Sequence, residues 1–266
     1  MEKNFLTKNA KIKFYTYANN RPDFVELQYR SLKHFMKNEF ELIVFNTCPF
    51  FQIRLRKEIK KKCRELEISC LPLRVIGYNN PSTTAAKLIQ KSFQKKIRKD
   101  TGISCIIDSD MFLLSQLDLK SYMTNFDVAG VWQTRDNVNY LWPGLLFLNM
   151  SFIKDKKMNF SCGEVEGERV DVGGNLYYWL KRNPNLRIRN IHHTSHICKE
   201  NNNLNTLPED IRKQYEDDFR FELYDRLFLH YGRGLNWDKM DQEYHKRKTE
   251  LASFFVGQAI AGKIIL

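Results

Sequence analysis

The stretch ISCIIDSDMFLL, residues 103–114, decides the fold. Its first five residues form a short apolar run of the kind that parallel sheets bury on both faces. Asp108 and Asp110 follow directly, and a second apolar run, 111–114, comes after them. Charge is costly between two buried segments unless a counter-ion compensates it. Ligands bind outside the carboxyl ends of strands in open parallel sheets, so this stretch predicts an α/β fold with a ligand site at the two aspartates.

The sequence on the N-terminal side of this stretch alternates between strand and helix patterns. Short β-branched or apolar runs predict strands at 11–18, 41–47 and 68–76. Apolar residues at helical spacing predict helices at 23–37, 53–66 and 84–99. Strands that alternate with helices in this way form right-handed βαβ units, so we expect a mainly parallel central sheet with flanking helices.

The second half of the chain is less regular. Strands are expected at 126–132 and 145–150, separated by a turn-rich loop. A helix is expected from about Asp171 to Leu180, followed by a loop over 183–210 and mixed strand and turn over 219–232. The apolar tail, 251–266, predicts a terminal helix docked on the rest. No segment resembles a linker, so we expect a single domain over 1–266.

The composition narrows the class of protein. The net charge is +12, but much of the excess lies in 54–65 and 87–99, where lysines occupy the outward face of amphipathic helices. Aromatic residues that would stack on bases are not interleaved there, so we expect no nucleic-acid partner. The chain has no signal-like start, no apolar run of about 20 residues and no CxxC pair among its six cysteines, which predicts a soluble, cytoplasmic protein. Contact of the apolar tail with a membrane surface is the alternative interpretation of that segment.

The two aspartates have a chemical and a structural interpretation. Carboxylates two residues apart, on a chain that leaves a strand, can converge on one cation, and oxygen ligands suit Mg²⁺ or Mn²⁺. The structural alternative is a polar strand end that caps a neighbouring helix. The apolar runs on both sides favour the metal site.

An ordered set of motifs extends this prediction. The segments YTYANNRPDF (15–24), IIDSDMFLL (106–114), YLWPGLLFLN (140–149), VDVGGNLYYWL (170–180) and HYGRGLNW (230–237) follow one another along the chain. Together they resemble the GT-A glycosyltransferases, and in layout the glycogenin-like and lipopolysaccharide-sugar transferases. The resemblance covers roughly 11–237 and implies a GT-A domain, with a nucleotide-binding half over 1–110, an acceptor-side half over 111–250 and a C-terminal helix over 251–266.

The resemblance implies roles for individual residues. Asp108, Asp110 and His230 would hold a divalent cation, Mn²⁺ or Mg²⁺. A mixed shell of carboxylate and imidazole ligands favours Mn²⁺. Asp171 would act at the reacting centre. The residues expected to bind the nucleotide sugar are Tyr15, Thr16, Tyr17, Asn19, Arg21, Lys87, Ser109, Gly232 and Arg233. Those expected to contact the sugar or the acceptor are Trp132, Trp142, Gly144, Gly173 and Gly174.

The implied activity is transfer of a sugar from a nucleotide sugar, with a UDP-sugar as the expected donor, to a glycan or glycoconjugate. A nucleotidyltransferase or another metal-dependent phosphoryl-transfer enzyme is the alternative, although the segment from Tyr15 to Pro22 has no glycine-rich phosphate loop. A basic nucleic-acid-binding protein is a third possibility, but it gives no function to the DSD triplet (108–110) or the HYGRG segment (230–234). The chain departs from the family at Trp142-Pro143, Val172 and Leu235-Asn236, positions that help to select the sugar or hold the phosphates, so the resemblance implies no particular sugar. Asp171 is compatible with either an inverting or a retaining reaction.

One histidine-rich run stands outside these motifs. His192, His193, His196 and Cys198 lie within seven residues and would suit a zinc ion. Structural zinc sites usually join two separated pairs of ligands, so the run favours an acceptor-side or surface loop over a zinc site.

Overall fold

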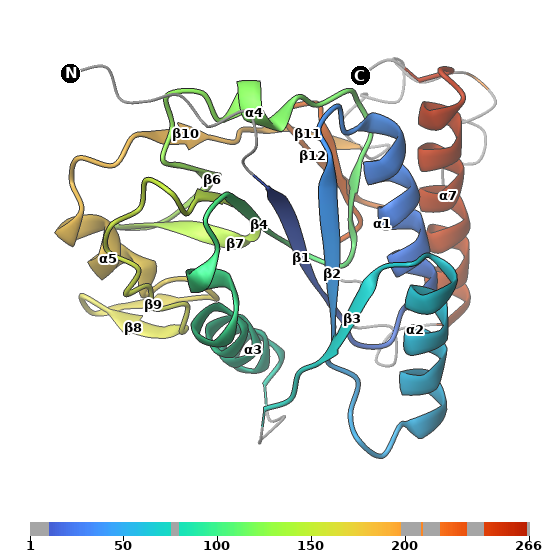
Figure 1. Cartoon of the computed structure of the whole chain (residues 1–266), viewed down its shortest axis with the longest axis horizontal. Helices are drawn as coiled ribbons and strands as arrows, with labels where there is room; N and C mark the ends of the chain where they lie inside the picture. Colours follow the sequence, from blue (N-terminus) through green and yellow to red (C-terminus); the bar gives the residue numbers. More distant parts are fainter. Residues whose placement is uncertain (1–10, 76–79, 198–208, 210–218, 233–241, 265–266) are drawn as a thin grey trace.

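The computed structural model describes residues 11–75, 80–197, 209, 219–232 and 242–264. A central sheet runs through the molecule (Figure 1). Its strands are β1 (Ile12–Ala18), β2 (Phe40–Asn46), β3 (Ser69–Pro72), β4 (Ile103–Ile107), β6 (Val128–Arg135), β7 (Val138–Asn149) and β10 (Ile188–Asn190). The order across this seven-stranded sheet is β10-β6-β7-β4-β1-β2-β3. β7 runs antiparallel to its neighbours β4 and β6, and the other pairs are parallel. The predicted mainly parallel α/β fold is therefore confirmed.

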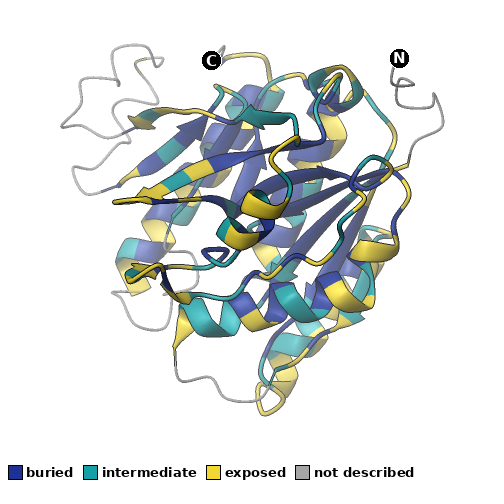
Figure 2. Ribbon diagram, turned by 90° about the vertical axis from the view of Figure 1, so that its left-hand side faces the viewer, coloured by how far each residue is buried: buried dark blue, intermediate teal, exposed yellow. Residues whose placement is uncertain are grey.

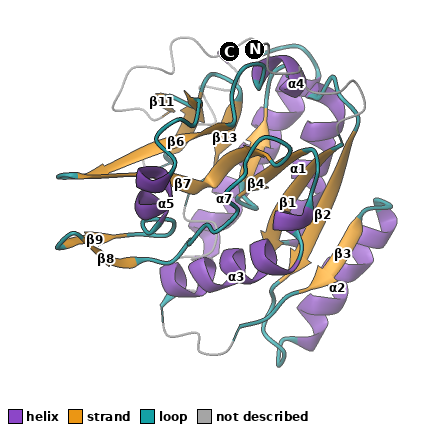
Figure 3. Ribbon diagram, turned by 60° about the vertical axis from the view of Figure 1, so that its left-hand side comes forward, coloured by secondary structure: helices purple, strands orange, loops and turns teal. Residues whose placement is uncertain are grey.

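Helices cover both faces of this sheet. They are α1 (Pro22–Phe35), α2 (Ile53–Glu65), α3 (Pro81–Lys95), the short 3-10 helix Ile97–Lys99, α4 (Leu119–Tyr122), α5 (Leu176–Arg182) and α7 (Gln242–Ile260). α1, α2 and α7 lie together on one side, whereas α3 and α5 lie on the other (Figures 1 and 3). The alternation of side chains along β1 explains this division. Phe14 points into the core shared with α1, and Tyr15 points into the core shared with α3.

A second, smaller sheet places the C-terminal motif beside the aspartates. It contains β5 (Met111–Leu113), β11 (His193–Ile197), β12 (Phe221–Tyr224) and β13 (Phe228–His230) in the order β11-β12-β13-β5. All of its neighbouring pairs are antiparallel. A two-stranded ribbon of β8 (Gly163–Val165) and β9 (Glu168–Val170) precedes α5.

Several expectations for the second half are wrong. The segment 133–144 is not a loop, because β6 and β7 continue through it and meet at a two-residue turn after Arg135. Asp136 in that turn has a φ of 43°, a left-handed conformation that aspartate tolerates. The helix expected near Asp171 begins at Leu176, and the segment 183–210, expected to be a loop, contains β10 and β11.

The C-terminal helix begins before the apolar tail and packs on α1. Leu251, Ala252, Phe255 and Val256 are buried there, so its apolar face is covered by the molecule itself. Figure 2 shows the same pattern throughout, with buried strands inside and exposed residues on helix faces and hairpin tips. Among the described residues, no helix combines the length and the apolar character needed to span a bilayer.

Candidate metal and donor site

The aspartate turn is fixed by backbone hydrogen bonds from two neighbouring elements. The Asp108 N–H donates to the Gly144 carbonyl oxygen of β7 at 2.8 Å. On the other side, the Gln28 amide of α1 donates to the carbonyl oxygens of Asp108 and Met111 at 2.8 and 2.9 Å. Gln28 is buried, so this amide is unavailable to solvent. The chain is therefore held in one position as it leaves β4, and the two carboxylates emerge at the carboxyl end of that strand.

His230 reaches the aspartates through the small sheet. β13 pairs with β5 so that His230 lies opposite Met111, the residue after Asp110. Its Nε2 lies 3.4 Å from Asp110 Oδ1. One ligand atom from each of Asp108, Asp110 and His230 falls within 4.8 Å of the others. The two aspartates and His230, which lies more than a hundred residues further along the chain, thus converge on one point.

The two carboxylates at this point repel each other. Burial, and then the neighbouring charge of Asp110, raise the pKa of Asp108, and the charge of His230 offsets part of this rise. Burial on its own lowers the pKa of His230, but the charge of Asp110 and hydrogen bonds to Asp110 and Glu222 outweigh it and raise that pKa to about 10. A positively charged imidazole therefore lies beside two carboxylates. A bound divalent cation would stabilise the two negative charges in the same way.

Glu222 is a site residue that the sequence did not indicate. His230 Nδ1 donates to Glu222 Oε2 at 2.7 Å, and the Tyr224 hydroxyl donates to the same oxygen at 2.9 Å. Burial acts to raise the pKa of Glu222, but the hydrogen bond and charge of His230 lower it to about 2. Glu222 orients the His230 ring so that Nε2 points at Asp110. No local pattern could reveal this, because the contact depends on the pairing of β12 with β13.

Trp142 lies beside His230, and Gly144 packs against the Trp142 ring. Between Gly130↔Leu146 and Val131↔Trp142 the register shifts, so residues 143–145 bulge out of β7. The Trp142 ring lies 5.2 Å from the His230 ring between centroids. An added Cβ at Gly144 would meet this indole at 2.1 Å. Gly144, expected to contact the sugar or the acceptor, therefore makes room for the Trp142 ring.

Asp171 lies in the turn before α5, beside the bulged part of β7. Its N–H donates to the Tyr140 hydroxyl at 3.3 Å, and its carboxylate is exposed and accepts from the N–H of Val172. The glycines after it are packed, because an added Cβ at Gly173 would meet Pro143 at 2.6 Å and one at Gly174 would meet Val170 at 2.1 Å. The space in the Cβ direction of both glycines, which were expected to contact the sugar or the acceptor, is thus occupied by protein.

The expected nucleotide-binding residues divide into three groups. Tyr15, Thr16 and Arg21 are buried, which contradicts a role for their side chains in nucleotide contact. The Tyr15 hydroxyl donates to Asp100 at 2.7 Å, and the Arg21 guanidinium pairs with Asp23 and lies over the Phe24 ring. Alternation along β1 directs Tyr15 and Thr16 into opposite cores.

The second group remains accessible. Its members are Tyr17, Asn19, Lys87, Ser109 and Gly232. The Tyr17 hydroxyl forms a hydrogen bond with the Ser92 hydroxyl at 2.6 Å. Burial raises the pKa of Tyr17, the hydrogen bond with Ser92 offsets this in part, and the charge of Asp108 adds to the rise. Gly232, two residues after the end of β13, has a φ of 67°, which favours glycine. Arg233 lies outside the described residues.

Trp132, expected to contact the sugar or the acceptor, lies on β6 in the hairpin of β6 and β7 and is 37 % exposed.

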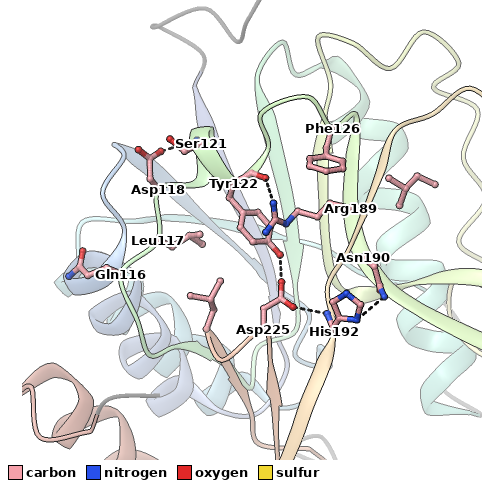
Figure 4. A pocket seen from close by; sticks show the side chains of 12 residues that line it. Gln116, Leu117, Asp118, Ser121, Tyr122, Phe126, Arg189, Asn190, His192 and Asp225 are labelled. Atoms are coloured by element: carbon pink, nitrogen blue, oxygen red, sulfur yellow. Dashed lines mark hydrogen bonds between the residues drawn. The ribbon is translucent and has the colours of Figure 1, made fainter.

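A groove elsewhere on the surface contains none of the residues expected to bind the metal, the nucleotide sugar or the acceptor (Figure 4). Arg189, Tyr122, Asp225 and His192 line it. Their polar groups already satisfy one another, because Arg189 donates to the Tyr122 carbonyl, the Tyr122 hydroxyl donates to Asp225, and the His192 N–H donates to the other oxygen of Asp225. The groove therefore adds nothing to the site at the aspartates.

Comparison with known proteins gives likenesses in structure alone. No protein-family model and no curated protein sequence matches the chain. The mannosyltransferase PcManGT from Pyrobaculum calidifontis, solved with GDP-Man and Mn²⁺, is similar with a TM-score of 0.47 and 8 % identity, over 69 % of this chain and 55 % of that one. An active-site mutant of LgtC is similar with a TM-score of 0.36 and 11 % identity, over 66 % of this chain and 65 % of that one.

A third similar structure is the core-mannan synthase A from Aspergillus fumigatus in its Mn/GDP form, with a TM-score of 0.34 and 12 % identity, over 94 % of this chain and 66 % of that one. The chain thus spans less than two thirds of the length of these three proteins.

Proposed function

We propose that this chain is a metal-dependent glycosyltransferase that moves a sugar from a nucleotide sugar to a glycan or glycoconjugate. The observation that carries the proposal is the convergence of Asp108, Asp110 and His230 at the carboxyl end of β4, with ligand atoms within 4.8 Å of one another. This is the place where open parallel sheets bind their ligands. We further propose that residues 1–266 act as one domain.

The donor set fits a divalent cation that prefers oxygen ligands and accepts an imidazole. Two carboxylates and one histidine favour Mn²⁺ over Mg²⁺. A cation held there would neutralise the diphosphate of the donor and the charge that develops on the leaving nucleotide. The side chains that would hold it are Asp108, Asp110 and His230. The raised pKa of Asp108 supports this fit, because it reflects two buried carboxylates that repel each other.

The surrounding residues supply position. Gln28 and Gly144 fix the turn that carries the carboxylates, and Glu222 fixes the His230 ring. Trp142 forms an apolar wall against that ring. Asp171, exposed in the turn over β7, would take the proton from an acceptor hydroxyl if the reaction inverts the sugar, or would orient the donor if it retains.

The nucleotide is open between UDP and GDP. The motifs of the sequence favour a UDP-sugar, whereas two of the similar structures are described with GDP-Man or GDP. Hydrolysis of UDP- and GDP-sugars with Mn²⁺ in the absence of acceptor would separate these donors. Release of the nucleoside diphosphate indicates glycosyl transfer, and release of pyrophosphate from a nucleoside triphosphate would indicate nucleotidyl transfer instead.

The variant Asp110→Asn tests the metal assignment in the same assay. We expect it to abolish Mn²⁺-dependent turnover. The amide keeps the shape of the buried Asp110 side chain, and circular dichroism would show that the variant is folded. Asp118→Asn is the matched control, because Asp118 caps α4 and asparagine caps a helix about as well as aspartate. Full activity of Asp110→Asn, or of the wild type in excess chelator, would overturn the proposal.

Contact with a membrane surface is also part of the proposal, but at a different place from the C-terminal tail. The apolar side chains of α7 are buried, whereas Phe50 and Phe51, just before α2, are 67 % and 66 % exposed. Lys57, Lys60 and Arg64 on α2 are exposed as well and form no ion pair with a described residue. Aromatic side chains beside a basic helix face fit an anionic lipid surface.

A further inference from the structure

A second cluster of metal-ligating side chains lies at the edge of the small sheet. His193 and His196 belong to β11, and Glu222 belongs to β12. One ligand atom from each falls within 4.8 Å of the others. The two imidazole rings are 4.2 Å apart between centroids. None of the three has a role as a ligand in the site at Asp108 and Asp110.

A β-bulge brings the two histidines to the same face. Side chains three residues apart on a regular strand point to opposite faces of a sheet. Here His193 pairs with Tyr224 and Ser195 pairs with Leu223, so β11 has one residue more than β12 and Thr194 is the extra one. The Thr194 hydroxyl donates to the Leu223 carbonyl at 3.0 Å and holds the bulge. The histidine spacing thus yields a convergent pair that the sequence spacing alone would not.

Cross-strand register adds the carboxylate. His196 lies opposite Glu222, and Glu222 lies opposite His230 in the next strand. Residues directly opposite in antiparallel pairs point to the same face, with Cβ atoms roughly 5 Å apart. One row across the sheet therefore presents His196, Glu222 and His230 on a single face, and His193 joins it through the bulge.

We propose that His193, His196 and Glu222 form a second metal site, which takes Zn²⁺ or a similar imidazole-preferring transition metal. Two imidazoles and one carboxylate with an open fourth position are a ligand set that zinc accepts. Zinc–nitrogen bonds of about 2.1 Å place tetrahedral ligand atoms roughly 3.4 Å apart, so the cluster would have to contract slightly around the ion. Both histidines are exposed, so an ion can reach them from solvent.

Glu222 also links this cluster to the first site. Its Oε2 atom accepts hydrogen bonds from His230 Nδ1 at 2.7 Å and from the Tyr224 hydroxyl at 2.9 Å. Glu222 would then face two metals, one directly and one through His230. The proposal does not depend on glycosyl transfer, since it concerns a different ligand set.

Zinc binding measured by calorimetry tests the site. In an Asp108→Asn/Asp110→Asn background, which lacks the carboxylates of the first site, we expect one zinc equivalent to bind and the pair His193→Ala/His196→Ala to abolish it. The matched control removes His34 and His192, which also are exposed histidines but lie outside the cluster. This control should keep the zinc equivalent. Circular dichroism before the titration shows whether each variant is folded.

The wild-type chain provides an independent measurement that needs no altered aspartates. Its zinc stoichiometry should fall by one site when His193 and His196 are replaced, and it should stay unchanged in the His34/His192 control. Equal loss in both pairs, or unchanged zinc binding without His193 and His196, would overturn the second site. Absence of nucleotide-sugar turnover in the wild-type chain, with zinc binding retained, would contradict the proposed function and leave the second metal site standing.

Discussion

At the scale of single residues, His230 shows how strongly a neighbourhood sets the behaviour of a side chain. An isolated histidine has a pKa near 6.5, whereas Asp110 and Glu222 raise that of His230 to about 10 in the absence of metal. The ring must lose this proton before Nε2 can bind a cation. The same charges that prepare the site for a metal therefore also make protons compete for it.

This competition predicts a pH dependence of metal binding. The folded metal-free chain holds the His230 proton below about pH 10, so Mn²⁺ affinity should fall as the pH is lowered from about 8.5 to about 6.5, by up to tenfold per unit. Calorimetry in buffers of different ionisation enthalpy would measure the protons released. A heat that is the same in every buffer would contradict the prediction.

The variant Glu222→Gln is the control for the cause of this shift. It keeps the shape of the side chain but removes one of the charges that raise the pKa of His230. We expect fewer protons to be released on Mn²⁺ binding and the affinity to fall by roughly 10–100-fold, the scale of a lost partner of a metal-bound histidine. Unchanged proton release would assign the shift to Asp110 alone.

Asp171 carries the prediction for the reacting centre. Asp171→Asn should keep Mn²⁺ and the nucleotide bound, because the residue lies in the turn over β7 and not at the aspartate turn. Transfer should fall by about 100-fold or more, the scale of a lost acid–base or charge-stabilising group. Binding and turnover rates measured separately would show this. If both stay near wild type, Asp171 has no part in the chemistry.

At the scale of elements, β4 shows which parts of the site the sequence could predict. A short apolar run that ends in two aspartates is local information, and β4 and its turn lie where the pattern predicts. The hairpin of β6 and β7 was missed, because Asn, Asp, Pro and Gly in 133–144 read locally as a loop. Pairing over eight residues on each side overrides those turn preferences, and Pro143 and Gly144 are accommodated in a bulge.

The loop into β4 carries a prediction for stability. At Gly102 an added Cβ would lie 2.0 Å from the Lys11 carbonyl oxygen, which is backbone and cannot rotate away. Gly102→Ala should therefore lower the free energy of unfolding by about 1–3 kcal/mol, as overpacking does. Gly257→Ala in α7 is the matched control, because its Cβ meets nothing within 4 Å. It should instead stabilise by up to about 1 kcal/mol. Chemical denaturation of both would reveal whether they shift in the same direction, which would contradict the steric argument.

At the scale of the whole molecule, the placement of exposed apolar side chains predicts how the protein meets a lipid surface. Phe50 and Phe51 project beside the basic face of α2. Vesicles that contain anionic lipid should bind the chain in co-sedimentation, less so at high salt. Phe50→Ser/Phe51→Ser should weaken binding by about tenfold or more, because each buried phenyl contributes roughly 1.5–3 kcal/mol.

The control for this prediction is Tyr178→Ser. Tyr178 is also an exposed aromatic residue, 40 % accessible, but it lies on α5 away from the basic helix. Vesicle binding should be unaffected by this change. Equal loss in both variants, or equal binding to neutral vesicles, would show that α2 and the two phenylalanines do not form the contact.

The sequence by itself determined the alternation of strands and helices, the mainly parallel sheet and the two aspartates at the end of a central strand. These follow from local periodicity, because apolar spacing and strand ends are encoded within a few residues. Only the tertiary structure decided that Tyr15 and Thr16 lie in the core, that Gly144 accommodates Trp142, and that Glu222 joins His230. A sheet covered on both faces buries both sets of alternating side chains, and the register between distant strands has no local signature. Contacts across strands are therefore determined by the tertiary structure.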